Sequence, residues 1–258
     1  MSVTKEIILK FEFDFKGQTV LITGATRGIG KAAAEQFFQL GASLVLTGTK
    51  QEQVNALNRG RKNQARIEYH CVDFSDREST ERFLKDIGRL KRIDVCINNA
   101  GINRINDIDQ GLLADLDDMM NVNLKAPYLL IRQVSKVMKR QKYGRIVNVG
   151  SIFSQISRPK RSMYSMTKFG LHGITVAAAN ELAQHNVLIN TLSPGFVLTD
   201  LTKKNLSRVE RAELKRGIPM GRFARPEEIA KLIVFLASSQ NTYLTGQNII
   251  ADGGYVNV

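Results

Sequence analysis

The stretch Val20-Leu-Ile-Thr-Gly24-Ala-Thr-Arg-Gly28-Ile-Gly30 decides the fold, and a segment of helical composition, Lys31-Ala-Ala-Ala-Glu-Gln-Phe-Phe, follows it directly. An apolar run, a glycine turn and a helix form the first half of a βαβ unit, in which the helix N-terminus faces the pyrophosphate of a dinucleotide. Gly24 allows the tight turn, Gly28 lets the backbone approach phosphate, and Gly30 permits close packing of helix on strand. A glycine triplet alone is weak evidence, but here the strand and the helix both accompany it.

Apolar runs alternate with amphipathic segments along the rest of the chain. This alternation predicts an α/β, Rossmann-type fold: a doubly wound parallel sheet of about seven strands between two layers of helices. The expected strands are 20–23, 44–47, 67–72, 93–98, 145–149, 187–192 and 247–251. The expected helices are 28–40, 76–89, 115–140, 162–184 and 226–238. No linker or internal repeat divides the sequence, so we predict a single domain over 1–258.

Two segments lie outside this alternation. Residues 1–16 form an N-terminal extension in which Phe11, Phe13 and Phe15 alternate with polar residues, a pattern that fits either an added edge strand or a cover over apolar surface. Residues 198–219 are rich in Lys and Arg, lack strand character and follow a predicted strand, so we expect them to act as a substrate lid.

Tyr164 and Lys168 lie four residues apart in a helical pattern, and Ser151 ends an earlier apolar run. Positions i and i+4 share a helix face, so an ammonium group is expected beside a phenol. A phenol has an ordinary pKa of about 10, and a neighbouring positive charge lowers it toward a range useful for acid-base catalysis. An isolated Tyr-x-x-x-Lys is more often a surface pair, and a lone serine more often a helix cap. The rest of the chain favours chemistry here.

With these motifs in view, the chain resembles the short-chain dehydrogenase/reductase family from about Phe15 to Val258. The family motifs occur in order: 23–30, Asp73, Asn98-Asn-Ala-Gly101, Asn123, Ser151, Tyr164 with Lys168, Pro194-Gly195 and Asp252-Gly-Gly254. The resemblance implies an enzyme, an NAD(P)-dependent oxidoreductase that transfers hydride between nicotinamide and a carbonyl or secondary alcohol. A cofactor-sensing regulator on the same fold is an alternative, although such a protein is expected to lack Tyr164 or Lys168.

The resemblance also implies the catalytic roles. Tyr164 exchanges a proton with the substrate oxygen, and Ser151 hydrogen-bonds that oxygen. Lys168 lowers the pKa of the tyrosine and binds the nicotinamide ribose, and Asn123 holds a water that links the lysine to solvent. Asn123 lies inside a long helical pattern where asparagine is disfavoured, and this local misfit points the same way.

The second strand predicts the cofactor type. NAD-dependent enzymes commonly place a carboxylate there to bond the free ribose hydroxyl, but this chain has Thr47-Gly-Thr49-Lys50, and Arg27 in the glycine turn offers a cation to a 2′-phosphate. NADP(H) is therefore predicted, with NAD(H) as the alternative. Asp73 is expected either to meet adenine or to cap the helix that starts near Asp76. The full set of expected cofactor contacts is Gly24, Thr26, Arg27, Gly28, Ile29, Gly30, Thr47, Thr49, Lys50, Asp73, Phe74, Asn99, Ala100, Gly101, Tyr164, Lys168, Pro194, Gly195, Val197 and Thr199.

The substrate is less well determined. The segments 144–151, 190–195 and 221–229 look most like those of 3-oxoacyl-acyl-carrier-protein reductases, but they recur in sugar, polyol and sugar-acid dehydrogenases of the family. The positions that dock the carrier protein correspond to Lys142 and His185, and a largely neutral histidine weakens that interpretation. The sequence Arg158-Pro-Lys160-Arg161 precedes the tyrosine and suggests selection of a carboxylated or phosphorylated substrate, with a solvated turn as the alternative.

Composition limits the remaining classes. The net charge of +13 suits an acidic partner, an anionic substrate or nucleic acid, but no nucleic-acid motif accompanies it. Cys71 and Cys96 lie in apolar runs, which predicts reduced core thiols, and no residue grouping suggests a metal. No apolar run is long enough for a membrane span and the N-terminus is too charged for a signal peptide, so we predict a cytoplasmic protein. By resemblance we expect a homotetramer or homodimer.

Overall fold

The computed structural model describes residues 13–60, 66–199, 202 and 207–257. In this part of the chain every strand belongs to one parallel sheet, in the order β3-β2-β1-β4-β5-β6-β7. The strands are β1 (Thr19–Ile22), β2 (Ser43–Gly48), β3 (Ile67–Cys71), β4 (Val95–Asn98), β5 (Gly144–Val149), β6 (Val187–Pro194) and β7 (Asn248–Ala251). The predicted Rossmann-type fold is thereby confirmed.

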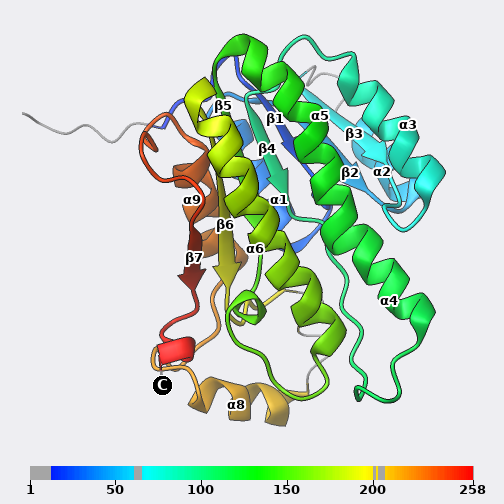
Figure 1. Ribbon diagram of the computed structural model, residues 1–258, viewed down its shortest axis with the longest axis vertical. Coiled ribbons are helices and arrows are strands. Elements are labelled where there is room, and N and C mark those ends of the chain that lie inside the picture. The colour runs from blue at the N-terminus through cyan, green and yellow to red at the C-terminus, as the bar shows by residue number, and fades with distance from the viewer. Residues whose placement is uncertain (1–12, 61–65, 200–201, 203–206, 258) are drawn as a thin grey trace, which may run out of the picture.

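Helices cover both faces of the sheet (Figure 1). They are α1 (Gly28–Gln39), α2 (Gln51–Arg59), α3 (Arg77–Gly88), α4 (Leu113–Met120), α5 (Ala126–Gln141), α6 (Ser162–Leu182), α8 (Arg208–Arg216) and α9 (Pro226–Ala237). A π-helical turn (Asn121–Lys125) joins α4 to α5. The sequence predicts one continuous helix over 115–140, which the structure divides at the π-helical turn, and it does not predict the helices α2 and α8.

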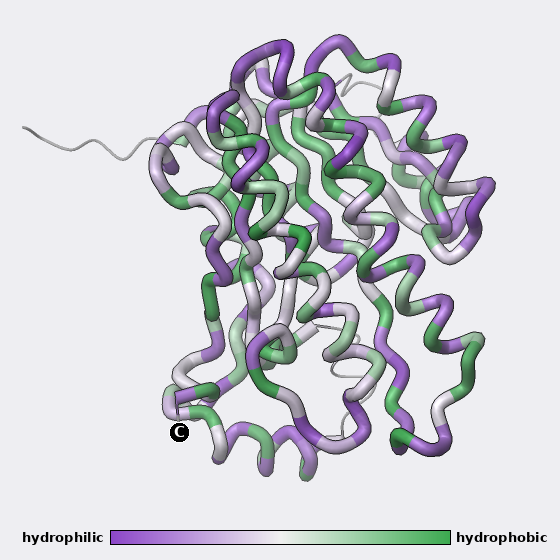
Figure 2. The backbone as a smooth tube through the Cα atoms, viewed as in Figure 1, coloured by the Kyte–Doolittle hydropathy of each residue, from purple (hydrophilic) through white to green (hydrophobic). Residues whose placement is uncertain are grey.

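The strands are buried on both faces, and this explains their continuous apolar composition. Because successive side chains on a strand point to opposite faces, Val20 and Ile22 of β1 pack into a core with α1 and α9, whereas Leu21 packs into a second core with α3, α5 and α6. Figure 2 shows the hydrophobic strands at the centre and hydrophilic positions along the outer turns of the helices.

Phe15 belongs to the first core and is fully buried. Its ring lies edge-on to the ring of Phe37 on α1, with a centroid distance of 4.8 Å, and its backbone N–H donates to the carbonyl of Leu40. The end of the N-terminal extension therefore covers apolar surface, and the described residues add no strand there. Phe11 lies outside the described residues.

The order of the strands reverses between β1 and β4, because the chain builds outward from β1 to β3 and then returns to the other side. Loops at the carboxyl ends of two such strands diverge and leave a crevice, which is the usual ligand site of a doubly wound sheet. The glycine turn follows β1 and Asn99 follows β4. The topology thus brings the two motifs together.

A substitution at Gly30 would test the close approach between these two loops. A β-carbon there would lie 2.4 Å from both the Nδ2 atom of Asn99 and the carbonyl oxygen of Gly24. We expect Gly30→Ala to lower the free energy of unfolding by about 1–3 kcal/mol, the usual cost of overpacking, and so to lower the thermal midpoint by several degrees. Gly173→Ala on α6 is the matched control, because its β-carbon would meet nothing within 4 Å. An equal loss of stability in both variants would contradict this assignment.

Candidate active site

Ser151 stands just after β5 and has extended backbone angles. Its Oγ atom accepts a hydrogen bond of 3.2 Å from the N–H of Phe153 and so caps a short 3-10 turn (Ile152–Ser154). The same side chain lies close enough to Tyr164 to act to lower the pKa of its phenol. The two alternatives that the sequence left open for this serine, helix cap and site residue, are therefore compatible in one geometry.

Tyr164 and Lys168 lie one turn apart on α6, as their spacing predicted. The Nζ atom of Lys168 is 5.6 Å from the centroid of the Tyr164 ring and donates a 2.9 Å hydrogen bond to the carbonyl of Val149 at the end of β5. Lys168 is only 4% exposed. The ring of Phe153 packs edge-on against Tyr164, with a centroid distance of 6.1 Å. These contacts join α6 to the carboxyl end of β5.

Burial dominates the electrostatics of this pair. It raises the pKa of Tyr164, while the hydrogen bond from Ser151 and the positive charge of Arg161 act to lower it. Burial also lowers the pKa of Lys168 to about 8, because the charged amine is removed from water. The Lys168 ammonium lies 5.6 Å from the centroid of the Tyr164 ring, so its effect on the tyrosine pKa stays a prediction, and Arg161 is a second cation that acts to lower that pKa.

Asn123 lies in the π-helical turn and is fully buried. Its Oδ1 atom accepts from the N–H of Ile102 at 2.8 Å, and its Nδ2 atom donates to the Ile102 carbonyl at 2.8 Å and to Thr167 Oγ1 at 3.2 Å. A β-carbon at Gly101 would lie 3.4 Å from Asn123 Oδ1 and 3.8 Å from Lys168 Nζ, so these two side chains flank the same glycine. Single π-helical turns frequently occur at functional sites, and this one coincides with the asparagine that fits a helix poorly.

A chain of buried hydrogen bonds holds the surrounding strands in register. Asn98 Nδ2 donates to Asn148 Oδ1 at 2.7 Å, Asn148 Nδ2 donates to Thr175 Oγ1 at 2.8 Å, and the Thr175 and Thr191 hydroxyls are 2.7 Å apart. The chain crosses β4, β5, α6 and β6. Because a fully satisfied polar network fixes one arrangement of its elements, it positions the helix that carries Tyr164 relative to the strand that ends at Ser151.

The glycine turn and the loop after β4 form a second set of contacts. Gly24 and Gly28 have positive φ angles of 65° and 57°, which side chains disfavour. The Gly24 N–H donates to Thr47 Oγ1, and the N–H groups of Asn99 and Ala100 both donate to Thr23 Oγ1 at 2.9 Å. A cavity of about 440 Å³ runs along these loops.

Most of the expected cofactor contacts line this cavity. They are Gly24, Thr26, Arg27, Gly28, Ile29, Thr47, Thr49, Asp73, Phe74, Asn99, Ala100, Gly101 and Thr199. Gly30, Lys50, Tyr164, Lys168, Pro194, Gly195 and Val197 are not among its lining residues. Sequence reasoning missed Gly48, Val72, Ser75, Ile102, Arg104, Asp118 and Val122. Of these, only Arg104 carried a signal, as a cation three residues after the Asn-Asn-Ala-Gly motif.

The structure separates the two roles that we considered for Asp73. Asp76 caps α3, since its carboxylate accepts from the N–H of Glu78. Asp73 instead accepts from the N–H and the hydroxyl of Ser75, at 2.9 and 2.7 Å, and lies at the cavity wall. The helix cap is therefore excluded for Asp73, which leaves the cofactor contact as its expected role.

The family model for enoyl-(acyl carrier protein) reductases matches residues 24–256, which is nearly the whole described chain. The chain belongs to the short-chain dehydrogenase/reductase family. It is an oxidoreductase. It is 37% identical to the 3-oxoacyl-[acyl-carrier-protein] reductase of Aquifex aeolicus, over 94% of this chain and 99% of the relative. The corresponding reductase of Thermotoga maritima is also 37% identical, over 93% and 98%.

Among solved structures, the short-chain dehydrogenase/reductase is similar to a gluconate 5-dehydrogenase from Burkholderia cenocepacia in complex with NADP and tartrate. The TM-score is 0.87 and the sequence identity 27%, and the likeness covers 95% of this chain and 98% of the other. The two kinds of relative therefore have different substrates on one fold. The substrate has to be argued from the site itself.

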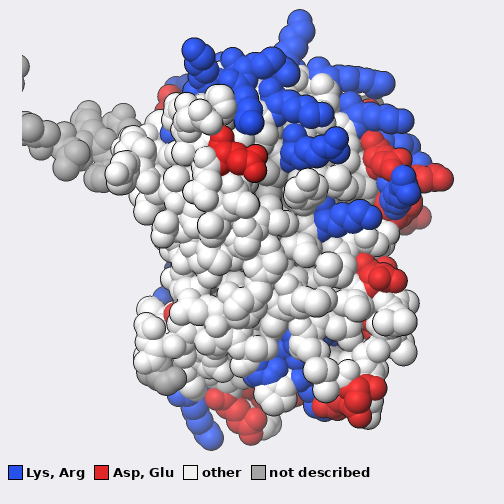
Figure 3. Space-filling model, in the orientation of Figure 1, with Lys and Arg blue, Asp and Glu red and all other residues white. Residues whose placement is uncertain are grey.

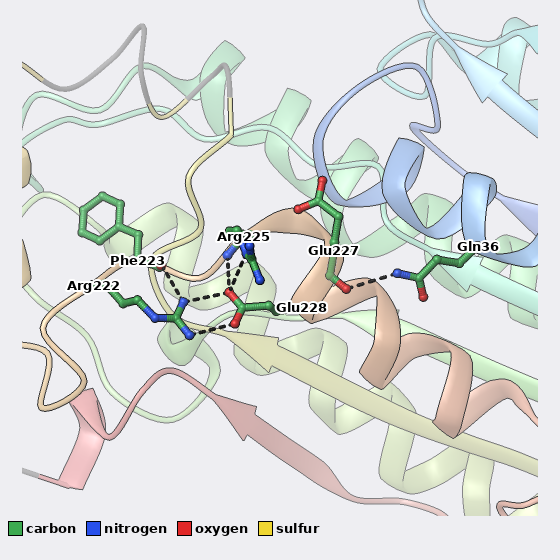
Figure 4. Close-up of polar contacts among 6 residues, drawn as sticks. All are labelled: Gln36, Arg222, Phe223, Arg225, Glu227 and Glu228. Carbon is green, nitrogen blue, oxygen red and sulfur yellow. Dashed lines mark hydrogen bonds and ion pairs between the residues drawn. The ribbon is translucent and has the colours of Figure 1, made fainter. Parts of the chain in front are cut away.

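In this short-chain dehydrogenase/reductase, the segment after β6 is anchored at both ends. Val197 and Ala224 form an isolated bridge, and Arg222 makes a two-pronged ion pair with Glu228 at the start of α9, with both N–O distances 2.8 Å (Figure 4). The pairing with Arg222 and a hydrogen bond from the Arg225 N–H lower the pKa of Glu228 to about 2. Gln36 of α1 donates to the carbonyl of Glu227 and ties α9 to the dinucleotide-binding helix.

The basic residues of the short-chain dehydrogenase/reductase gather far from this site. Figure 3 shows most of the blue surface at the end of the molecule opposite α8 and the C-terminus. The exposed cations there, at the amino ends of the strands, include Arg89, Lys91, Arg92, Lys136, Lys139, Arg140 and Lys142. The structure thus joins clusters that are distant in sequence into one basic surface.

In the described part of the chain, no helix is long and apolar enough to cross a membrane.

Proposed function

We propose that the protein interconverts a ketone and a secondary alcohol with NADP(H), and that Ser151, Tyr164, Lys168 and Asn123 form its catalytic site. The observation that carries this is that Ser151, Tyr164 and the buried Lys168 gather at the carboxyl end of β5, where Ser151 acts on the Tyr164 phenol and Lys168 donates to the Val149 carbonyl. Tyr164 gives its proton to the carbonyl oxygen, or takes one from the alcohol. Ser151 hydrogen-bonds the same oxygen as negative charge develops on it.

The contacts of Lys168 and Asn123 indicate how these two residues support the reaction. The Lys168 amine donates to the Val149 carbonyl and lies near the tyrosine ring, where it supplies a positive charge. Because its pKa is about 8, this amine can also take part in proton exchange. Asn123 shapes the loop that carries Ile102 and, by family resemblance, passes protons on through water. The segment 198–219, of which residues 200, 201 and 203–206 lie outside the described residues, is our candidate for the substrate lid.

The cavity fits a dinucleotide. The glycine turn and the loop after β4 approach closely at its wall, since a β-carbon at Gly24 would lie 3.0 Å from the Cα atom of Ala100 and both residues line the cavity. Thr26, Arg27, Gly28 and Ile29 would hold the pyrophosphate and 2′-phosphate, and Asp73 the adenine. When bound, the nicotinamide supplies or accepts the hydride. Lys50 does not line the cavity. Two cations do, Arg27 and Arg104, and Arg27 is our candidate for the 2′-phosphate because it lies in the glycine turn.

Two substrate classes have support. The curated relatives are 3-oxoacyl-[acyl-carrier-protein] reductases, which favours a 3-oxoacyl thioester. Lys142 and His185, however, lie in adjoining loops at the amino ends of β5 and β6, opposite the catalytic end within one chain. A sugar acid is the second candidate, because Arg158 and Arg161 both lie over the ring of Phe153, which packs against the catalytic tyrosine.

The test is NADPH oxidation with a panel of 3-oxoacyl thioesters, keto sugar acids and uncharged diketones. We expect turnover with at least one class and a kcat lowered by about 10³-fold in the Tyr164→Phe variant. Failure of every carbonyl substrate, together with tight NADPH binding, would favour the cofactor-sensing regulator instead. A cytoplasmic homotetramer, paired through the helices α5 and α6, is the state that we propose for the enzyme.

We expect Arg27→Ala to change the cofactor preference. Hydrogen bonds to charged groups contribute about 1.5–3 kcal/mol, so the NADPH dissociation constant is expected to rise by about 10- to 100-fold while that of NADH changes little. Fluorescence titration of both nucleotides measures this ratio. Lys31→Ala is the matched control, since Lys31 is exposed near the start of α1 and pairs with Glu35. A parallel weakening of NADPH and NADH would assign Arg27 to the pyrophosphate instead.

A further inference from the structure

The loop between Ser151 and Tyr164 carries three cations that the structure treats differently. Lys160 is exposed and pairs with Asp107 at 3.2 Å. The guanidinium carbon of Arg158 lies 5.7 Å from the ring centroid of Phe153 and 5.8 Å from that of Phe196. The guanidinium carbon of Arg161 also lies 5.7 Å from the Phe153 centroid. Two arginines therefore share one aromatic ring, while the lysine points elsewhere.

Arg161 is buried without a counter-charge. It is 8% exposed, its Nη1 atom has no hydrogen-bond partner, and no ion pair joins it to any residue that the structure describes. Burying an unpaired cation is unfavourable, and burial together with the charge of Arg158 lowers the pKa of Arg161. Such a cost is tolerated where the group serves a ligand.

The position of Arg161 at the start of α6 adds a second unfavourable electrostatic interaction, with the helix dipole. It is the N-cap residue of a 21-residue helix, where the helix dipole presents its positive end. Its side chain makes no capping hydrogen bond, and the first turn of α6 contains no acidic residue. Both the guanidinium and the free N–H groups of that turn therefore attract an anion, and none of the described side chains supplies one.

The site of this attraction is the catalytic centre. Arg161 and Tyr164 are separated by one helical turn, and the Phe153 ring contacts both. The charge of Arg161 also acts on the Tyr164 hydroxyl. An anion bound at Arg161 would consequently lie a few bonds from a carbonyl held by Tyr164 and Ser151.

We infer that Arg161, assisted by Arg158, binds an oxyanionic group of the substrate, so that the enzyme selects small oxo compounds carrying a carboxylate or phosphate near the reacting carbonyl. The planar guanidinium fits the geometry of either group through two parallel hydrogen bonds. The inference rests on the proposed function and narrows its substrate class. It favours an oxo acid over a thioester, whose carbonyl has no charged neighbour.

The experiment compares substrates that differ only in charge. We would measure kcat/KM with NADPH for acetoacetate against ethyl acetoacetate, and for dihydroxyacetone phosphate against dihydroxyacetone, in the wild type and in Arg161→Gln. The wild type is expected to prefer the anion in at least one pair, and the pair shows whether carboxylate or phosphate is the ligand. Arg161→Gln is expected to reduce that preference by about 10- to 100-fold, the usual worth of hydrogen bonds to a charged group.

Two further variants separate binding from structure. Arg161→Lys keeps the charge but loses the fork geometry, so it should retain part of the preference. Lys160→Gln removes a charge from the same loop and should leave the preference unchanged. Thermal unfolding of Arg161→Gln is expected at or above the wild-type midpoint, because an unpaired buried charge is removed. A structural role for Arg161 predicts a lower midpoint and equal losses for charged and uncharged substrates, which would overturn the inference.

Calorimetry of malonate binding, with and without saturating NADP⁺, tests the site without turnover. We expect binding to the wild type that weakens at least 10-fold in Arg161→Gln and is unchanged in Lys160→Gln. If no carbonyl compound is reduced but malonate still binds through Arg161, the proposed function fails and the anion site stands. If uncharged substrates are reduced while the wild type neither binds malonate nor prefers an anion, the anion site fails and the proposed function stands.

Discussion

Tyr164→Phe is expected to lower kcat by about 10³-fold, within the range of about 10²–10⁴ that a positioned general acid contributes. The phenylalanine ring keeps the edge-on packing against Phe153 but lacks the hydroxyl that Ser151 contacts. Steady-state NADPH oxidation measures the loss, and nucleotide titration should show an unchanged dissociation constant. Activity retained within a factor of a few would remove Tyr164 from the proton-transfer step.

Tyr143→Phe is the matched control for this substitution. Tyr143 precedes β5, at the opposite end of the sheet from the site, and its buried hydroxyl has no hydrogen-bond partner. Removing an unpaired buried hydroxyl costs little, so this variant should keep both activity and stability. A loss of activity similar to that of Tyr164→Phe would show that the assay reports folding rather than chemistry.

The pH dependence of the wild type follows from the same tyrosine. Burial raises the Tyr164 pKa, so the hydroxyl is protonated at neutral pH and is ready to donate. Reduction of the carbonyl should therefore proceed at neutral pH, whereas oxidation of the alcohol should accelerate as the pH rises and the phenolate forms. Initial rates in both directions between pH 6 and pH 10 would check this, and a rate of oxidation that is flat across this range would count against it.

Lys168→Met is expected to lower kcat by about 100-fold or more without destabilising the protein. Methionine matches the length of the lysine side chain but carries no charge, so the cation beside Tyr164 is lost. The folded-state pKa of about 8 lies below the ordinary 10.5, a difference equivalent to about 3 kcal/mol of unfavourable burial. Removing the charged amine therefore adds stability, and loss of its hydrogen bond to the Val149 carbonyl offsets part of this gain in stability.

The sign of the pH effect on stability distinguishes Lys168 from an ordinary lysine. Between about pH 8 and pH 10.5 the unfolded chain holds a proton that the folded chain has released, so stability rises with pH in this window. Below it the burial cost is present in full. The thermal midpoint of Lys168→Met relative to the wild type should thus be highest at pH 7 and should fall toward pH 10. A constant difference would show that Lys168 does not titrate in this way, and Lys136→Met, an exposed change on α5, provides the baseline.

The fold could be predicted because its signals are local. The glycine turn, the continuous apolar strands and the amphipathic segments each report on residues close in sequence, and the parallel sheet follows from their alternation. Element boundaries were less certain, and the π-helical turn at Asn123 was foreseen only as a misfit within a predicted helix. The short helix α2 was missed because its low apolar content leaves Val54 as its only buried residue.

The sequence named the candidate site residues but could not give the effect of burial on their pKa values. Ser151, Tyr164, Lys168 and Asn123 were all named from motifs, yet the burial that raises one pKa and lowers another depends on contacts between α6 and β5. The sequence placed three equivalent cations before the tyrosine. The structure pairs Lys160 with Asp107 and leaves Arg161 buried and unpartnered.

Spacing along the chain was sufficient to predict the class of fold, the dinucleotide-binding turn and the candidate catalytic residues, because each depends on the periodicity of a strand or helix. Folding alone decided which cation before the tyrosine is paired and which is buried, which aspartate caps α3, and that basic clusters distant in sequence form one surface away from the site. Those outcomes depend on burial and on distances between segments far apart in sequence. Both arise only when the helices pack on the sheet.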